Sequence, residues 1–167
     1  MWSTRCASPL DYRRSANIDQ FQAYEAQPTA KTSSNKGGRA IILVVERDPN
    51  IRDLEAYFLN EAGFAVEFAT DGVAAFEQAK KIRPDIVITE VLVPKLDGLS
   101  LCRRIKSDAD LSRTVVLIFS ILAVQARAKD AGADAFLMKP LAEQRLVDTV
   151  RQLLGTRGPS ASTGDIS

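Results

Sequence analysis

The chain has 167 residues, of which 46% are hydrophobic and 26% are charged. This length and composition predict one domain with a single sizeable core, flanked by tails. Lysine and arginine number 22 against 21 aspartate and glutamate, so the charge gives no basic excess of the kind that binds nucleic acids without sequence specificity.

The sequence contains no histidine and only two cysteines. Its own side chains therefore exclude histidine-based catalysis, histidine metal ligands and a phosphohistidine. Cys6 and Cys102 are far apart in the chain, which favours reduced thiols over a disulfide framework. No apolar stretch reaches the roughly 18 residues that span a bilayer, and the N-terminus lacks the apolar region of a signal peptide. We expect a cytoplasmic protein with no membrane partner.

Residues 1–38 are rich in small and polar side chains and end in SSNKGG, a composition typical of flexible linkers. They predict a disordered polar arm, in which QFQAY around Phe21 could be a docking segment. The folded core is expected over 39–154. Residues 155–167 are again small and polar and predict a disordered tail. Too few residues follow Pro140 for a second folded domain, so we expect the core to stand alone.

Short apolar runs alternate with segments of helical period between these tails, a pattern typical of a parallel sheet covered by helices on both faces. The fivefold repeat predicts an α/β fold with five strands and five helices. The expected strands are AIILVVE (40–46), FAVEFA (64–69), DIVITE (85–90), TVVLIFS (114–120) and DAFLMK (134–139).

Capping residues divide the intervening helices. Gly63 is expected to end the first helix, and the second must end before Pro84. The fourth is short, from about 123 to 131, and the fifth begins near 142 with an apolar stripe. The expected N-caps of the first three helices are Asp48, Thr70 or Asp71, and Asp97.

Polar side chains stand at the ends of four predicted strands. In an open α/β sheet, ligands bind beyond the carboxyl ends of the strands, at the point where the strand order reverses. We therefore expect these side chains to converge on one site. They are Glu46 and Arg47 after the first strand, Glu90 after the third, Ser120 after the fourth and Lys139 after the fifth.

Four motifs resemble the receiver domain of bacterial response regulators: ILVVERDPNIR, IVITEVLVPKLDGLSLCRRIK, VVLIFS and AGADAFLMKP. The resemblance implies a flavodoxin-like, doubly wound parallel sheet of order 2-1-3-4-5. In that family, an acidic pair after the first strand and an aspartate ending the third hold Mg²⁺, and this aspartate accepts a phosphoryl group from a histidine kinase. A hydroxyl ending the fourth strand and a lysine ending the fifth bind the phosphoryl oxygens. Ser120 and Lys139 match these two positions.

The other positions depart from the family pattern. Glu90 occupies the phospho-acceptor position, and Glu46 and Arg47 occupy those of the acidic pair. Glutamate is one methylene longer than aspartate, and a misplacement of about 1 Å can cost on the order of 100-fold in rate. Arg47 brings a fixed positive charge to a position where Mg²⁺ needs an oxygen ligand. No cofactor is expected. If a metal does bind, Glu46 and Glu90 are the candidate ligands.

Counting Glu46 and Glu90 against Arg47 and Lys139 gives a site that is neutral without any ion. We therefore interpret Glu90 as a fixed charge paired with Arg47 or Lys139. Its longer carboxylate, aimed at Ser120 and Lys139, could also imitate the phosphorylated state. Whether the resulting state is the active or the resting one stays open.

Phe136 matches the aromatic residue whose rotamer follows the state of the family's hydroxyl, although core packing also explains it. The segment between Ser120 and Gly132 is shorter than is usual in the family. This difference alters the face formed by the fourth helix, fifth strand and fifth helix, where the family binds partners or dimerises. Partners are expected to be signalling proteins, a histidine kinase or a downstream effector, with a homodimer also left open and no direct nucleic-acid partner.

The predicted function is that of a stand-alone receiver-like protein in a two-component phosphorelay, acting by protein binding rather than as an enzyme. The alternative is a working phospho-receiver that accepts a phosphoryl group from a histidine kinase through a distorted Mg²⁺ site. A nucleotide-binding or flavodoxin-like enzyme is disfavoured because RDPN, and no glycine-rich phosphate loop, follows the first strand.

Overall fold

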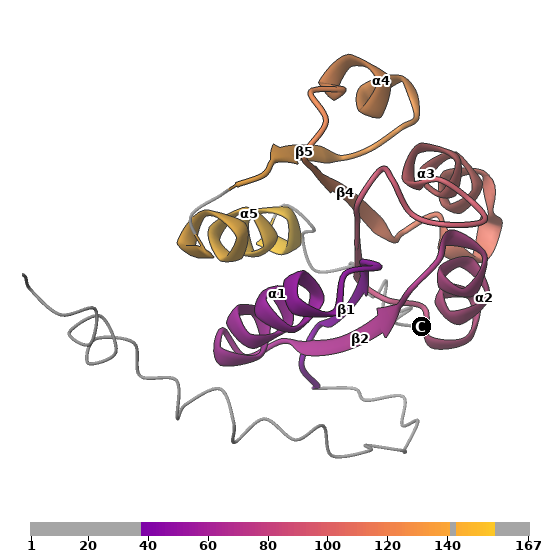
Figure 1. Cartoon of the computed structure of the whole chain (residues 1–167). Coiled ribbons are helices and arrows are strands. Elements are labelled where there is room, and N and C mark those ends of the chain that lie inside the picture. The colour runs from indigo at the N-terminus through magenta and orange to yellow at the C-terminus, as the bar shows by residue number, and fades with distance from the viewer. Residues whose placement is uncertain (1–37, 141–142, 156–167) are drawn as a thin grey trace, which may run out of the picture. The chain divides into compact units, whose positions relative to one another are not determined.

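The computed structural model describes residues 38–140 and 143–155, which alternate between strands and helices (Figure 1). The predicted arm lies outside the described residues except for Gly38, and the predicted tail does so except for Gly155. The strands are β1 (Ile41–Val45), β2 (Ala65–Ala69), β3 (Ile86–Thr89), β4 (Val115–Ser120) and β5 (Ala135–Met138). The helices are α1 (Pro49–Glu61), α2 (Gly72–Ile82), α3 (Gly98–Ser107), the 3-10 turn η3 (Ala109–Leu111), α4 (Gln125–Asp130) and α5 (Glu143–Gly155).

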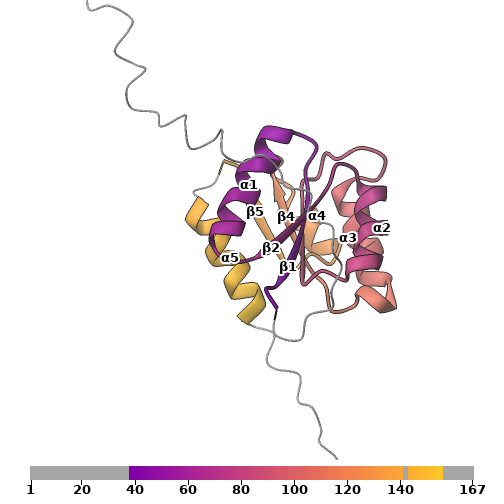
Figure 2. The same ribbon diagram turned by 90° about the horizontal axis from the view of Figure 1, so that it is seen from below.

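All strand pairs are parallel and the sheet order is β2-β1-β3-β4-β5, which confirms the predicted fold class. The strands at the centre of the sheet are continuous Val, Ile and Leu runs because both of their faces are covered by helices. Viewed along the sheet, α1 and α5 lie on one side and α2 and α3 on the other (Figure 2).

The period of two along each strand divides the core into two hydrophobic clusters. In β1, Ile42 and Val44 belong to the cluster with Leu146 and Val150 of α5. Leu43 and Val45 point to the opposite face, into the cluster that contains residues of α2, α3 and α4. Burying one such side chain completely stabilises the fold by about 1.5–3 kcal/mol, so both faces contribute to holding the strand ends in place.

Three aspartates begin the first three helices, as the sequence predicted. The Asp48 carboxylate accepts the backbone N–H of Asn50 at 2.9 Å, and Asp71 accepts that of Ala74 at 2.8 Å. Asp97 caps α3 in the same way. Such a cap satisfies helix donors that have no partner within the helix. The cap at Asp48 fixes where α1 begins, and thereby which of its turns faces the end of the sheet.

Helix α4 has six residues and α5 ends at Gly155, one residue beyond the expected boundary. The short α4 agrees with the shortened segment seen in the sequence. Its N-cap residue, Val124, provides no side-chain hydrogen bond, so α4 lacks the polar cap that α1, α2 and α3 have. Within the described part of the chain, no helix is both long enough and apolar enough to cross a membrane.

Gly98, the first residue of α3, is required by close packing against the end of β3. A Cβ added there would overlap the carbonyl oxygen of Glu90 and approach the Thr89 hydroxyl to 3.1 Å. We predict that Gly98→Ala lowers the free energy of unfolding by about 1–3 kcal/mol in urea denaturation, since the backbone around Glu90 must shift. Gly155→Ala is the matched control, because nothing lies within 4 Å of its added Cβ. Equal stability of the two variants would contradict this packing.

Candidate functional site

The carboxyl ends of β1, β3, β4 and β5 meet at one edge of the sheet, as expected from the sequence. The backbone hydrogen bonds between parallel strands continue into the residues that directly follow the strands. The Glu90 N–H donates to the Val45 carbonyl at 3.2 Å, and the Lys139 N–H donates to the Ser120 carbonyl at 2.8 Å. Glu46 directly follows β1 at the same edge. The main chain therefore places these side chains together before they make any contact of their own.

Lys139 is the centre of the site. Its Nζ lies 2.8 Å from Glu46 Oε2, 2.9 Å from Glu55 Oε1 and 3.7 Å from Glu90 Oε2. It also lies 4.7 Å from the centroid of the Phe119 ring. The lysine side chain is only 10% exposed. Burial lowers the pKa of Lys139, but the neighbouring Glu55 and Glu46 carboxylates outweigh burial and raise this pKa above its ordinary value. The ammonium form is therefore the one that the site holds.

Glu90 is 7% exposed, and donors surround both of its carboxylate oxygens. Oε1 accepts the hydroxyl of Ser120 and the backbone N–H of Val91, the latter at 2.7 Å. Oε2 accepts the backbone N–H of Ile121 at 3.3 Å and faces the Lys139 ammonium. This arrangement supplies a buried carboxylate with the hydrogen bonds and the opposite charge that it needs.

Both carboxylate oxygens of Glu46 also accept donors. One of its oxygens accepts the backbone N–H of Asp48 at 3.0 Å, and the other accepts the Lys139 ammonium. Arg47, in contrast, is exposed, and none of the ion pairs among the described residues includes it. A long guanidinium side chain that follows a strand end keeps its hydration by pointing outward. Of the two partners considered for Glu90, the structure therefore gives Lys139.

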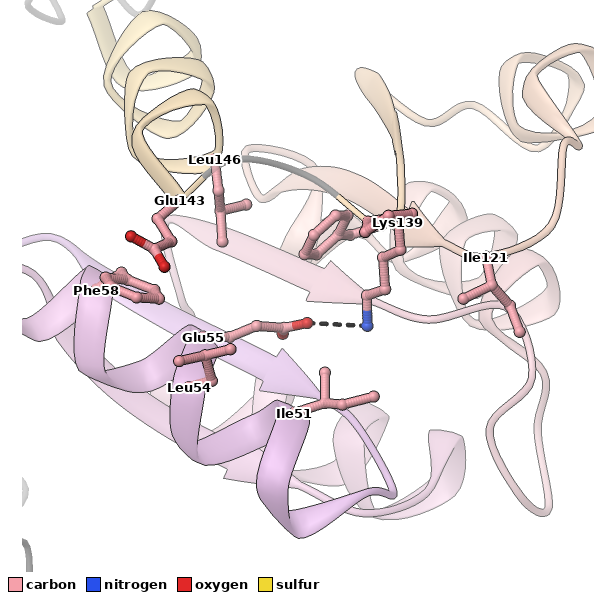
Figure 3. Close-up of a pocket in the computed structure, with 10 residues that line it drawn as sticks. Ile51, Leu54, Glu55, Phe58, Ile121, Lys139, Glu143 and Leu146 are labelled. Atoms are coloured by element: carbon pink, nitrogen blue, oxygen red, sulfur yellow. Dashed lines mark ion pairs between the residues drawn. The ribbon is translucent and has the colours of Figure 1, made fainter. Parts of the chain in front are cut away.

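Sequence reasoning missed a third carboxylate at this site. Glu55, on α1, is 6% exposed and lies beside Lys139 (Figure 3). Three carboxylates thus face one ammonium, and the expectation of a neutral site is corrected. The sequence did carry a signal, because Glu55 lies four residues after Ile51 and three before Phe58, on the apolar side of its helix. A carboxylate in such a stripe needs a buried partner.

The remaining predicted residues are placed as follows. Ser120 is completely buried, and its hydroxyl oxygen accepts the Leu122 N–H at 3.1 Å. Phe136 is half-buried and packs against the core cluster beneath α2, α3 and α4. Cys102 is buried in the same cluster, and burial raises the pKa of its thiol to about 11, so it packs as a small apolar residue.

The fold, the strand ends, and the retained serine and lysine agree with one family. The model of the response regulator receiver domain matches residues 42–151. The chain belongs to the response regulator receiver family, which operates in two-component signalling.

Individual relatives agree with this assignment. The response regulator MprA of Mycobacterium leprae is 35% identical over 127 residues, which cover 75% of this chain and 56% of that protein. The chain spans about half the length of the curated relatives it matches.

Solved receiver structures have the same fold. The receiver domain of a signal transduction histidine kinase from Syntrophus aciditrophicus has a TM-score of 0.67 and 32% identity, covering 75% of this chain and 99% of that one. A receiver domain of a sensor histidine kinase from Pseudomonas aeruginosa, solved with magnesium coordinated in its active site cleft, has a TM-score of 0.66 and 26% identity, covering 71% of this chain and 99% of that one.

The receiver site should titrate through Glu55. Burial raises the pKa of Glu55 from 4.5 to about 7, against the opposing effect of Lys139. Between these values the folded state binds more protons than the unfolded state. The free energy of unfolding should therefore fall with rising pH across this window because of Glu55, by up to about 3 kcal/mol.

We predict that Glu55→Gln removes this component of the pH dependence, measured by urea unfolding between about pH 5 and pH 8. Glu61→Gln, a change at an exposed glutamate of the same helix, should leave the profile as it is in the natural chain. Parallel profiles for the natural chain and Glu55→Gln would show that Glu55 does not titrate in this range.

Proposed function

We propose that this receiver domain carries a degenerate phosphorylation site and signals by binding other proteins. The observation that carries the proposal is the environment of Glu90. Both of its oxygens already accept hydrogen bonds from Ser120, Val91 and Ile121, and the nearby ammonium of Lys139 opposes its charge. A carboxylate held in this way is a poor nucleophile, because attack would require it to give up these donors first.

The same contacts support mimicry of the phosphorylated state. By the family resemblance, the hydroxyl at Ser120 and the ammonium at Lys139 bind phosphoryl oxygens. Here both groups turn toward the carboxylate of Glu90 instead. The extra methylene of glutamate carries its negative charge outward from the strand end, toward the place where the family's phosphoryl group would stand. We infer that Glu90 keeps the Ser120 hydroxyl and the Lys139 ammonium directed at a negative charge, as in the phosphorylated state, without any phosphorylation.

The donor set does not fit the Mg²⁺ ion that the family implies. Magnesium takes about six oxygen ligands in near-octahedral geometry and loses its water reluctantly. Glu46 and Glu90 use all four of their carboxylate oxygens to accept N–H, O–H or ammonium donors. Arg47, at the second acidic position, has no side-chain oxygen to offer as a ligand. No step of the proposed mechanism therefore passes through a metal, and the domain acts as a binding protein rather than an enzyme.

We propose that its partners are signalling proteins of a two-component system, bound through the face formed by α4, β5 and α5. This face differs from an ordinary receiver because α4 has only six residues and no side-chain N-cap. Met138 of β5 is 47% exposed and provides an apolar contact at the same place. A flexible thioether suits a surface that must pack against a partner protein.

A phosphoryl mimic tests the proposal directly. We predict that adding Mg²⁺ and beryllofluoride to the full chain leaves the backbone NMR signals of Glu46, Glu90, Ser120 and Lys139 unchanged. In the Arg47→Asp, Glu90→Asp double variant, the same addition should shift these signals, because the variant restores the family's acidic residues and frees Ser120 and Lys139 for the mimic.

The double variant is also the control for an intact fold. Shifts in the natural chain that saturate with Mg²⁺ and beryllofluoride would overturn the degenerate-site proposal. They would favour the alternative, a working receiver that accepts a phosphoryl group from a histidine kinase through a distorted metal site.

A further inference from the structure

A cavity of about 360 Å³ lies between α1 and α5 and reaches the ends of β4 and β5 (Figure 3). This volume lies within the range of small-molecule sites in proteins, roughly 300–1,000 Å³. Its walls are apolar, and several of the side chains that form them are partly open to solvent. The apolar side chains are Ile51, Leu54, Phe58, Phe119, Ile121 and Leu146.

Two polar side chains that line the cavity, those of Glu55 and Lys139, form an ion pair. The side chain of Glu55 extends from α1 toward the ammonium of Lys139, which approaches from the opposite side (Figure 3). Glu55 Oε1 is buried, and among the described residues its polar neighbour is the Lys139 ammonium at 2.9 Å, which it shares with Glu46 and Glu90. A buried carboxylate whose charge partner is shared with two other carboxylates has capacity for a further donor.

The charges around the cavity favour a cation. Glu55 and Glu143 both line it, and Lys139 is the one positively charged residue in its described lining. That ammonium is shared, because it also contacts Glu46 at 2.8 Å and Glu90 at 3.7 Å. An anionic ligand would meet an excess of negative charge, whereas a second ammonium would neutralise part of that excess.

We propose that this cavity binds a small organic amine in its protonated form. The ammonium group of the ligand donates to the carboxylate of Glu55, and an aromatic or branched hydrocarbon group packs against Leu54, Phe58 and Leu146. Exposed apolar side chains at the rim support the second half of this assignment, since Leu54 is 43% exposed and Ile121 is 62% exposed. Burying them against a hydrocarbon group is favourable.

Such a ligand would compete with Lys139 for Glu55 and thereby connect the cavity to the strand-end site. Released from Glu55, the Lys139 ammonium would be left to Glu46 and Glu90. The cavity is thus a route by which a metabolite-sized cation could change the receiver site, and this holds whether or not Glu90 accepts a phosphoryl group.

Binding should depend on pH through Glu55. The charged groups that face it are Lys139 at the end of β5, Glu46 after β1, Glu90 after β3, and Glu143 at the start of α5. Burial raises the pKa of Glu55 to about 7, so an ammonium ion, which binds the charged form, should bind more weakly at pH 6 than at pH 8.

The test uses 2-phenylethylamine with the full chain, followed by NMR titration, with 2-phenylethanol and 3-phenylpropionate as the neutral and anionic probes. We expect the amine to bind at least tenfold more tightly than either probe and to shift the signals of Leu54, Phe58 and Ile121. Glu55→Gln should weaken amine binding at least tenfold, while Glu61→Gln should have no effect. The affinity of the natural chain for the amine should also fall several-fold between pH 8 and pH 6, a result that does not depend on any variant.

Three outcomes would overturn the proposal. Equal affinity for the amine and the alcohol would mean that Glu55 recognises no charge. A failure of all three probes to bind would mean that the cavity is not a ligand site. Shifts of the same residues that depend on protein concentration alone would identify a second copy of the chain as the occupant.

Discussion

The buried ammonium of Lys139 is the interaction on which the site depends. It lies among three carboxylates from three separate parts of the chain: the end of β1, the end of β3, and helix α1. Removing a charge partner from a buried cluster is far more costly than losing a pair on the surface, because the remaining charges stay out of water. Lys139 therefore connects α1 to the edge of the sheet and places a positive charge beside the carboxylate of Glu90, which Ser120, Val91 and Ile121 hold by hydrogen bonds. The mechanism we propose depends on this placement together with the hydrogen bonds that hold Glu90.

We propose that the glutamate at the acceptor position changes the chemistry of the site, while the fold stays that of a receiver. Its longer side chain reaches the hydroxyl of Ser120, the N–H of Ile121 and the vicinity of Lys139 at once. Of these, Ser120 and Lys139 are the groups that the family resemblance assigns to a phosphoryl group. Under the proposed function, Ser120 and Lys139 already contact a negative charge without phosphorylation, so control comes from elsewhere. The amine cavity beside Glu55 provides one such route, because the same lysine takes part in both sites.

Most of the fold was predictable from the sequence, whereas the site was only partly so. Continuous apolar runs set the strands, and Asp48, Asp71 and Asp97 set the helix starts, because these signals are local. The convergence of Ser120 and Lys139 follows from the parallel topology. The role of Glu55 does not, since it depends on which turn of α1 faces the end of β5. The exposure of the Arg47 side chain depends on competition between hydration and ion pairing. The sequence alone does not show which of the two is more favourable.

The side-chain ammonium of Lys139 tests this account most directly. In water, lysine ammonium protons exchange too quickly at neutral pH to be seen, but one that is buried and paired with carboxylates should exchange slowly. The account predicts a resolved ¹H–¹⁵N signal of Lys139 Nζ near pH 7, one that moves in Glu46→Gln and in Glu55→Gln and stays in place in Glu61→Gln. An ammonium that exchanges as fast as those of surface lysines, or one that ignores both substitutions, would contradict the placement of Lys139 at the centre of the site.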